Sequence, residues 1–386
     1  MKDWHIVTPE YPNDPGGVSD YCAIMAAGLA ARGFPVRVWC PASSRIEQNQ
    51  PGVTVTPALG RFRLADLRHT GRLLNRCPGP RHLFVQWVPH GYGWKSMNLP
   101  FCVWLWKRAR WDGDAVSLMV HEPCLAFREG SWRQDVAAAV HRVMLIFLLR
   151  ASSRICITVP GWASFLQPWR FGAGRPLEWL PIFSNIAVHA NSSAVDRYRE
   201  FFPPGSIVAG HLGTYSELLR PLLDGIVAPL LERQTNLYVL LLGMHSDSYC
   251  EDWRRRHPSL AARVCSTGKL DEAELSAALQ ACDIALQPYP DGISSRRGSA
   301  LAPLRHGLPV VSTRGYLTEP LWDEAEAVLM APAANPSAFV QETLRLIHDT
   351  NLRTSLSKRS LTFYQKHFAT EVILEQVVHD LDVPQY

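Results

Sequence analysis

Two adjacent arginines, Arg296 and Arg297, stand among serines and glycines in the stretch "DGISSRRGSALAPLRHGLPVV", residues 291–311. The apolar run that follows them and stops at Gly307 predicts a helix that begins directly after the arginines. The free amides of a helix N-terminus favour an anion, and guanidinium groups bind phosphate oxygens through paired hydrogen bonds. The chemistry predicted for this turn is therefore phosphate binding. Its candidate residues are Asp291, Ser294, Ser295, Arg296, Arg297 and Gly298.

A structural explanation of the same arginines stays open. Both would then be loop residues that pair with a nearby carboxylate such as Asp291. Cations are unfavourable at the N-terminal end of a helix dipole, which favours the phosphate interpretation. Arg305 and His306 lie at the other end of the same predicted helix, where cations complement the dipole, and we expect a structural role for both.

Paired glycines precede another predicted helix near the start of the chain. Gly16 and Gly17 follow the predicted strand "WHIVTP" (residues 4–9) and precede an Ala-rich helix that is closed by Gly33. Such a turn either binds an anion at the helix N-terminus or is a tight turn that needs glycine for its backbone conformation. The sequence leaves both explanations open.

A second phosphate candidate is the stretch "AGHLGTYSELL", residues 209–219. Thr214 lies three residues before Glu217, the spacing of a capping box that would begin a helix. The cap alone explains these two residues. Gly213 would in addition let the backbone approach a diphosphate, so Gly213 and Thr214 are counted with the candidate site.

Polar residues also follow two predicted strands in the first half of the chain, "HLFVQW" (residues 82–87) and "AVSLMV" (residues 115–120). Residues just past strand ends face the ligand crevice of open α/β sheets. The candidates are Gln86, His90, His121 and Glu122. We expect His121 and Glu122 to act on a substrate hydroxyl, with a purely structural loop histidine as the alternative for His121.

Short apolar runs alternate with helical segments along the whole chain, which predicts an α/β protein with parallel sheets. Its 386 residues exceed the size of one hydrophobic core, so two domains are expected. The double proline in "FFPPGS" (residues 201–206) suggests domains over 1–203 and 204–365. In the second domain, Asp271 is the predicted N-cap of the helix "EAELSAALQAC".

Composition excludes several classes of protein. The formal net charge of +4 is too small for a nucleic-acid-binding protein of this length. The nine cysteines are scattered without C-x-x-C pairs, which indicates thiols in a reducing compartment and neither disulfides nor a zinc site. The densest apolar run, residues 143–149, is too short to span a bilayer. We therefore expect a cytoplasmic protein.

The stretch "IVTPEYPNDPGGVSDYCAIMAAGLAARGFPVRVWCP" (residues 6–41) resembles the opening of family 4 glycosyltransferases of the GT-B fold. The segments "LYVLLLG" and "STGKLDEAELSAALQACDIALQPYPDGISSRRGSALAPLRHGLPVVSTRGYLTEPLW" follow the order of that family, as does the terminal "YQKHFATEVILEQVVHDL". The resemblance implies two Rossmann-like domains that face each other across a cleft. It also implies that the last helix, about residues 366–386, returns to the first domain.

Such enzymes move a sugar from a nucleotide-sugar donor, held by the C-terminal domain, to an acceptor on the first domain. The resemblance implies a retaining, metal-independent transferase of hexosyl or related glycosyl groups in glycan or natural-product assembly. It would need no cofactor, and its substrates would be a UDP- or GDP-sugar and a glycan, lipid-linked or small-molecule acceptor. His121 resembles a histidine that lies near the donor sugar in the family. Glu319 belongs to the matched stretch and is counted with the donor-binding residues.

The chain departs from the family at the turn that carries the arginines. Family members carry two glutamates separated by seven residues, and Ser294 and Ala302 stand at these places. The usual Arg and Lys after the first strand of the second domain are also missing, so Arg296 and Arg297 would supply that charge. The lost glutamates leave open a catalytically silent GT-B domain that senses sugar nucleotides or serves as a partner subunit. A sugar-nucleotide epimerase is disfavoured by the resemblance at the N-terminus.

The segment "AAAVHRVMLIFLLRASSR" (residues 137–154) has two interpretations. It is either a helix buried in the first domain or a surface that docks on a bilayer carrying a lipid-linked acceptor. In the second case Arg142, Arg150 and Arg154 would contact the lipid head groups, and the protein would associate peripherally with the inner face of a membrane.

Overall fold

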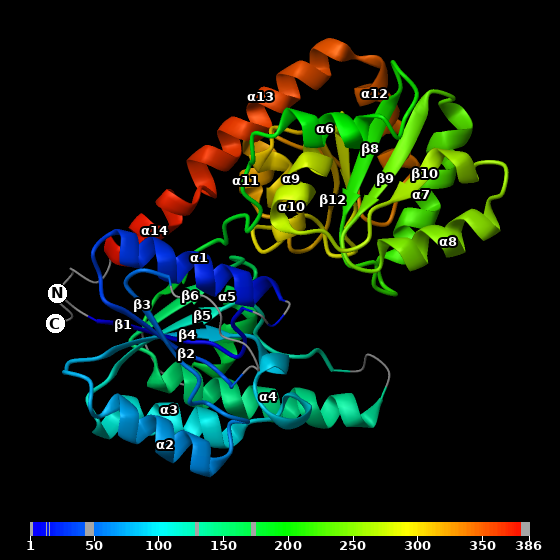
Figure 1. Cartoon of the computed structure of the whole chain (residues 1–386). Helices are drawn as coiled ribbons and strands as arrows, with labels where there is room; N and C mark the ends of the chain where they lie inside the picture. Colours follow the sequence, from blue (N-terminus) through cyan, green and yellow to red (C-terminus); the bar gives the residue numbers. More distant parts are fainter. Residues whose placement is uncertain are drawn as a thin grey trace. The chain divides into compact units, whose positions relative to one another are not determined.

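The computed structural model describes residues 3–12, 14, 16–42, 50–127, 131–170 and 175–379. The chain forms two compact units (Figure 1). The first unit comprises Met1–Ile182 and Thr370–Tyr386, and the second comprises Phe183–Ala369.

The first unit is built on a seven-stranded parallel sheet with the strand order β3-β2-β1-β4-β5-β6-β7. Its central strands are buried on both faces, which explains their continuous apolar sequences. The strands are β1 (Trp4–Val7), β2 (Val36–Trp39), β3 (Val53–Thr56), β4 (His82–Trp87), β5 (Ala115–Val120), β6 (Arg154–Ile157) and β7 (Leu177–Trp179).

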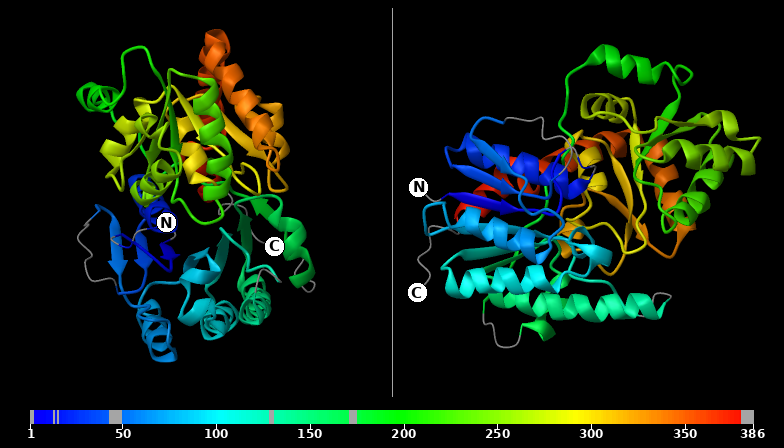
Figure 2. Two further views of the ribbon diagram at one scale, coloured as in Figure 1. Left: turned by 90° about the vertical axis from the view of Figure 1, so that its right-hand side faces the viewer. Right: turned by 60° about the horizontal axis from the view of Figure 1, so that its bottom comes forward.

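Helices cover both faces of this sheet (Figures 1 and 2). One face carries α2 (Leu64–Leu74), α3 (Leu99–Trp111) and α4 (Trp132–Ala151), and the other carries α1 (Gly17–Ala31) and α14 (Thr370–His379). Gly28 lets α14 approach α1, since a Cβ atom there would lie 2.3 Å from the side chain of Leu374. The remaining short helices are α5 (Trp162–Leu166), η1 (Pro89–Gly91), η2 (Trp94–Ser96) and η3 (Gln167–Trp169).

The second unit has a six-stranded parallel sheet with the strand order β10-β9-β8-β11-β12-β13. The strands are β8 (Ile207–Leu212), β9 (Leu237–Leu242), β10 (Val264–Ser266), β11 (Ile284–Gln287), β12 (Val310–Arg314) and β13 (Leu329–Pro332). The helices are α6 (Ser192–Arg199), α7 (Arg220–Arg233), α8 (Ser246–Arg256), η4 (Ala261–Arg263), α9 (Glu272–Gln280), α10 (Gly298–Arg305), α11 (Pro320–Glu324), α12 (Pro336–His348) and α13 (Thr350–His367).

These elements confirm the α/β class and the predicted helix after the arginines, α10, which is followed by Gly307 with a positive φ of 67°. Asp271 is the N-cap of α9 and accepts a hydrogen bond from the Glu274 amide at 2.9 Å. The helices α9 and α10 thus begin where their local sequence signals place them.

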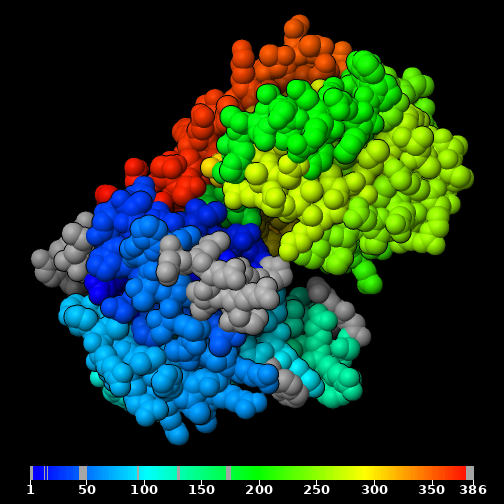
Figure 3. Space-filling model, in the orientation of Figure 1, coloured from blue at the N-terminus to red at the C-terminus, as the bar shows by residue number. Residues whose placement is uncertain are grey.

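The two units divide at Ile182, not at the expected residue 203. The segment between these positions packs on the second unit, where α6 lies over α9 (Figure 3). The amide of Ala187 donates to the Glu272 carboxylate at 2.7 Å, and Arg199 pairs with Asp283 at 2.8 Å. The double proline of 203–204 is a turn before β8, because contacts with residues distant in sequence decide where a domain ends.

A buried ion cluster joins the elements of the first unit at the start of β5. The side chain of Asp114 is fully buried and accepts hydrogen bonds from Arg81 Nε and Arg108 Nε, both at 2.6 Å. Arg108 also donates to Asn75 Oδ1 at 2.7 Å. The cluster therefore ties α2 and α3 to the amino edge of the sheet.

Replacing Asp114 by Ala is expected to destabilise the protein by about 3–5 kcal/mol, because it leaves the buried guanidinium of Arg108 and the partly buried one of Arg81 without their carboxylate. Chemical denaturation measures the free energy of unfolding. The matched control is Asp112→Ala, which removes a half-exposed carboxylate that lies 3.6 Å from the same Arg108 and should cost about 1 kcal/mol or less. Equal losses in the two variants would contradict a special role for the buried cluster.

Candidate functional site

The carboxyl ends of β4 and β5 bring Gln86 and His121 together in the first unit. His121 Nε2 lies 3.0 Å from Gln86 Oε1, and both side chains are buried. The ring of Tyr21 packs edge-on against the imidazole at 5.2 Å between centroids. Burial lowers the pKa of His121 to about 4, because the charged imidazolium would lose its water. The imidazole is therefore neutral at physiological pH and offers a hydrogen bond, not a charge.

His90 and Glu122, the other two predicted residues of this edge, form a second pair. His90 Nε2 lies 3.5 Å from Glu122 Oε2, and both side chains are exposed to solvent. This pair carries an ionic attraction only while His90 is protonated. The four polar residues predicted from the strand ends thus form one buried neutral pair and one exposed ionisable pair.

The carboxylate of Glu10 occupies the N-terminus of α1, where the sequence suggested an anion site at Gly16 and Gly17. Glu10 Oε1 accepts a hydrogen bond from the Ser19 amide at 3.0 Å. A Cβ atom on Gly16 would lie 2.2 Å from the same oxygen, so glycine makes room for the carboxylate. Burial raises the pKa of Glu10, while the amides of Ser19 and Val18 oppose that shift.

Glu10 is not among the residues predicted from the sequence. The signal for it was an acidic side chain in the loop that precedes the two glycines. Its position means that the chain supplies its own anion to this helix N-terminus, so Gly16 and Gly17 form a turn around an internal cap.

In the second unit, Arg296 and Arg297 converge on one carboxylate in the turn between β11 and α10. Arg296 Nη2 lies 2.6 Å from Asp291 Oδ2, and Arg297 Nη2 pairs with Asp291 Oδ1. The three side chains are 17%, 25% and 11% exposed, in the order Arg296, Arg297 and Asp291. The Arg297 guanidinium also lies over the ring of Tyr289, 4.7 Å from its centroid. The pairing with Asp291 that the sequence left open is thus what the structure contains.

The two serines of this turn have different surroundings. Ser295 donates its amide hydrogen bond to Glu319 Oε1 at 2.9 Å, and Trp322 Nε1 donates to Glu319 Oε2 at 2.7 Å. Burial raises the pKa of Glu319, and these hydrogen bonds oppose the shift. Glu319 is therefore a buried brace between two strand-end loops. Ser294 is also buried, and its hydroxyl has no hydrogen-bond partner in the described part of the chain.

The capping box predicted at Thr214 and Glu217 is wrong. The helix α7 begins at Arg220, with Leu219 as its N-cap, and Thr214 is exposed. The chain instead makes a turn at Tyr215, which has a positive φ of 54° and buries its ring. The Tyr215 hydroxyl donates to the His211 carbonyl at 2.9 Å. Tertiary burial of Tyr215 therefore overrides the local cap signal.

His211 is a further buried residue of this edge, and it is not among the residues predicted from the sequence. Its Nδ1 lies 2.7 Å from the Leu286 carbonyl, while its Nε2 has no hydrogen-bond partner among the residues described. Burial lowers the pKa of His211 to about 4, so Nε2 is a neutral acceptor. A Cβ atom on Gly213 would lie 2.9 Å from this nitrogen, so Gly213 accommodates the imidazole.

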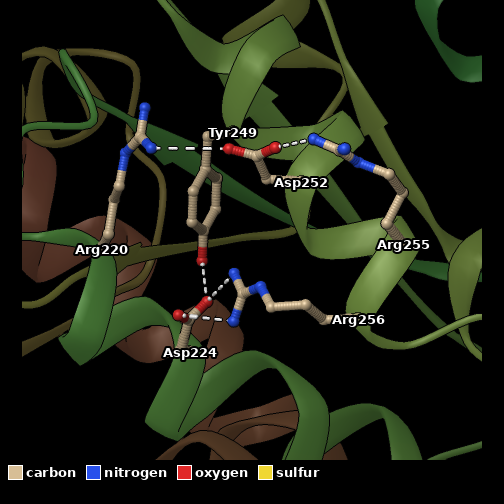
Figure 4. A pocket seen from close by; sticks show the side chains of 6 residues that line it. All are labelled: Arg220, Asp224, Tyr249, Asp252, Arg255 and Arg256. Atoms are coloured by element: carbon tan, nitrogen blue, oxygen red, sulfur yellow. Dashed lines mark hydrogen bonds and ion pairs between the residues drawn. The ribbon is translucent and has the colours of Figure 1, made fainter.

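A surface pocket of about 450 Å³ lies between α7 and α8 (Figure 4). Asp224 accepts hydrogen bonds from the Tyr249 hydroxyl and from Arg256, both at 2.8 Å. These groups satisfy one another as an ion-paired network, and none of the predicted site residues lines the pocket. Its lining residues are Arg220, Asp224, Tyr249, Asp252, Arg255 and Arg256.

Two family models match the chain, one in each half. The model described as "Glycosyl transferase 4-like domain" matches residues 16–178, and the model described as "Glycosyl transferases group 1" matches residues 205–349. A search of curated protein sequences finds no match.

Solved structures with low sequence identity share the fold. Sucrose-phosphate synthase (tll1590) from Thermosynechococcus elongatus is 14% identical, with a TM-score of 0.72 over 98% of both chains. Anabaena Alr3699/HepE in complex with UDP and glucose is 14% identical, with a TM-score of 0.68 over 99% of this chain and 100% of the other. WaaG, a glycosyltransferase involved in lipopolysaccharide biosynthesis, is 12% identical, with a TM-score of 0.66 over 99% of this chain and 100% of its own.

The matched segments contain the second sheet, the first sheet apart from β1 and the last residue of β7, and the two strand-end clusters described above. The two models together span most of the sequence. The chain therefore belongs to the family 4 glycosyltransferases of the GT-B fold.

Proposed function

We propose that this glycosyltransferase is a retaining, metal-independent enzyme that uses a nucleotide-sugar donor. The observation that carries the proposal is the pair of guanidinium groups, Arg296 and Arg297, at the N-terminus of α10 and the carboxyl edge of the second sheet. Open α/β sheets bind ligands at that edge. UDP is the nucleotide in the HepE complexes, which favours a UDP-sugar as the donor, with a GDP-sugar as the other candidate.

In the proposed reaction the bond between the sugar C1 and the diphosphate oxygen breaks, and a bond from an acceptor oxygen to C1 forms. Negative charge grows on the departing diphosphate. The guanidinium groups and the free amides of the first turn of α10 stabilise that charge without a bound cation. They also fix the donor relative to the second sheet.

The acceptor hydroxyl must lose its proton as the new bond forms. His121 is neutral and is oriented through Nε2 by Gln86, so its imidazole can hydrogen-bond a substrate hydroxyl without introducing charge. We assign the acceptor, a glycan, a lipid-linked sugar or a small molecule, to the first unit that carries this pair.

A second candidate function is a catalytically silent domain that binds sugar nucleotides or serves as a partner subunit. Ser294 and Ala302 stand where the family has its two glutamates, and Ala302 is fully buried in the core. A panel of nucleotide sugars separates the two functions: transfer or hydrolysis of any donor supports the enzyme, and binding without turnover supports the silent domain.

Exposed apolar side chains on α4 and α3 support the proposal that this surface docks on a bilayer. Trp132, Val136 and Val143 share one face of α4 and are 72%, 48% and 43% exposed. Trp111 of the adjacent α3 is 63% exposed, and Lys107 lies over its ring at 5.8 Å. Tryptophans flanked by cations are typical of helices that lie at a membrane interface.

Two of the three arginines predicted to contact lipid are instead buried. Arg142 Nη1 donates to the Ala138 carbonyl at 2.6 Å, and Arg154 pairs with Glu178 at 2.6 Å. Arg150 is exposed. No helix in the described ranges combines the length and apolarity needed to cross a bilayer. We propose that the protein associates peripherally, through Trp111, Trp132 and the apolar face of α4, with an anionic membrane that carries its acceptor.

The double variant Arg296→Ala/Arg297→Ala should raise the dissociation constant for the nucleotide sugar at least about tenfold, roughly 1.4 kcal/mol, because it removes both cations from the donor phosphate. Isothermal titration calorimetry with UDP- and GDP-sugars measures this change. The control is Arg314→Ala, which removes an exposed cation paired with Asp323 in the same unit. Unchanged donor binding in the double variant would refute the assignment of the arginines.

His121→Ala should lower kcat at least about tenfold if the imidazole positions a substrate hydroxyl. His69→Ala, which alters an exposed histidine on α2, is the control and should leave kcat unchanged.

The pH dependence of the free energy of unfolding is a second readout for His121. Because the folded pKa of about 4 lies below the unfolded value near 6.5, the folded state binds fewer protons between these values. The contribution of His121, up to about 3 kcal/mol, is present above pH 6.5 and is lost as the pH falls toward 4. His121→Gln should flatten that pH dependence of stability. Full turnover in His121→Ala would contradict the role of His121 in positioning a substrate hydroxyl.

The double variant Trp111→Ser/Trp132→Ser should lower binding to vesicles that contain phosphatidylglycerol at least about fivefold, because it removes both indole rings from the membrane interface. Vesicle sedimentation measures the bound fraction. Tyr316→Ser, which alters a side chain that is 81% exposed in the second unit, is the control. Equal binding of the wild type and the double variant would exclude this surface.

A further inference from the structure

Asp291 is a single carboxylate shared by two guanidinium groups at the N-terminus of α10. Arg296 and Arg297 both contact it through Nη2, each on a different oxygen. One negative charge therefore serves two positive charges in a turn where the side chains are 11–25% exposed. The helix N-terminus adds further positive potential at the same place.

The backbone of Asp291 is held firmly by the loop that follows β12. The Asp291 carbonyl accepts a hydrogen bond from the Leu317 amide at 3.0 Å. Gly292 has a positive φ of 88°, and a Cβ atom there would lie 2.2 Å from the Gly315 amide nitrogen. The backbone that carries the Asp291 carboxylate is therefore fixed, while the arginines reach the carboxylate through long, flexible side chains.

The buried cluster of Asp114 also places two guanidinium groups, those of Arg81 and Arg108, on one carboxylate. There each arginine has further acceptors: Arg108 donates to Asn75 Oδ1, and Arg81 donates to backbone carbonyls. In the described part of the chain, Arg297 Nε is buried and lacks a hydrogen-bond partner. The same is true of the buried Ser294 hydroxyl in the same turn. The Asp291 cluster thus contains two polar groups, Arg297 Nε and the Ser294 hydroxyl, that could hydrogen-bond a ligand with more oxygens than one carboxylate.

We propose that Asp291 is an internal competitor of the donor diphosphate. It holds the arginines in the ligand-free protein and gives up at least the guanidinium of Arg297 when a nucleoside diphosphate binds. Asp291 thereby sets donor specificity, because a diphosphate carries several oxygens and more than one negative charge, whereas a monocarboxylate merely repeats what Asp291 offers. This inference rests on the proposed donor site.

The test compares wild type with Asp291→Asn, which keeps the side-chain shape and removes the charge. The dissociation constants of UDP, GDP and inorganic pyrophosphate, measured by calorimetry, should fall about tenfold in the variant. Acetate should still bind too weakly to compete with these diphosphates. Asp323→Asn is the matched control, since it removes the same charge from an exposed arginine pair in the same unit and should change affinity less than about twofold.

Thermal unfolding provides a second readout that does not depend on a perfectly folded variant. Asp291→Asn should unfold at a lower temperature without ligand and show a larger increase than wild type on adding UDP. Asp291→Glu restores the charge and should return the affinity to the wild-type value or weaken it. Unchanged or weaker binding in Asp291→Asn would overturn the proposal and make Asp291 a positioning residue.

The outcomes also separate this inference from the proposed function. Tighter binding of pyrophosphate in Asp291→Asn, with no binding of UDP or GDP to either protein, supports the competition and argues against a nucleotide-sugar site. Binding of UDP, GDP and pyrophosphate that is equal in wild type and variant supports the donor site and overturns the competition. No binding of any diphosphate to either protein overturns both.

Discussion

Parallel strand pairing is the constraint on which both candidate clusters depend. Each strand must be followed by a crossover, usually a helix, that returns the chain to the same edge of the sheet, so all carboxyl ends collect on one side. In the first unit this places Gln86 of β4 beside His121, which follows β5. In the second unit it places the turn after β11 beside the loop after β12, where Glu319 braces Ser295.

Three internal carboxylates illustrate how surroundings decide what a charged pair does. Asp114 is fully buried among arginines that have further acceptors, and it stabilises the fold. Glu10 caps a helix whose glycine makes room for its oxygens. Asp291 also lies at a helix N-terminus, but two guanidinium groups converge on it. Asp114 and Asp291 each serve two guanidinium groups, but the Asp291 cluster adds the positive end of a helix dipole at the carboxyl edge of its sheet, which favours a multiply charged ligand.

Local signals predicted the elements that carry these clusters. The strands β1, β4 and β5 were predicted from their apolar runs, and Asp271 and Gly307 mark ends of α9 and α10. Short or half-exposed strands such as β3 and β10 gave too little apolar pattern to be predicted. The domain boundary and the cap at Thr214 were misplaced for a different reason, since burial of Tyr215 and the packing of α6 on α9 involve residues far apart in the chain.

The sequence by itself determined the α/β class, the family resemblance, the turn that presents Arg296 and Arg297, and the polar residues past β4 and β5. These features depend on residue type and short-range spacing, and both are visible directly in the amino-acid sequence. Only the tertiary structure decided which partner each charge or imidazole has: Asp291 for the two arginines, Gln86 for His121 and Glu10 for the N-terminus of α1. A side chain's partner is set by the distance and direction of groups that folding brings together, and one-dimensional spacing does not fix either.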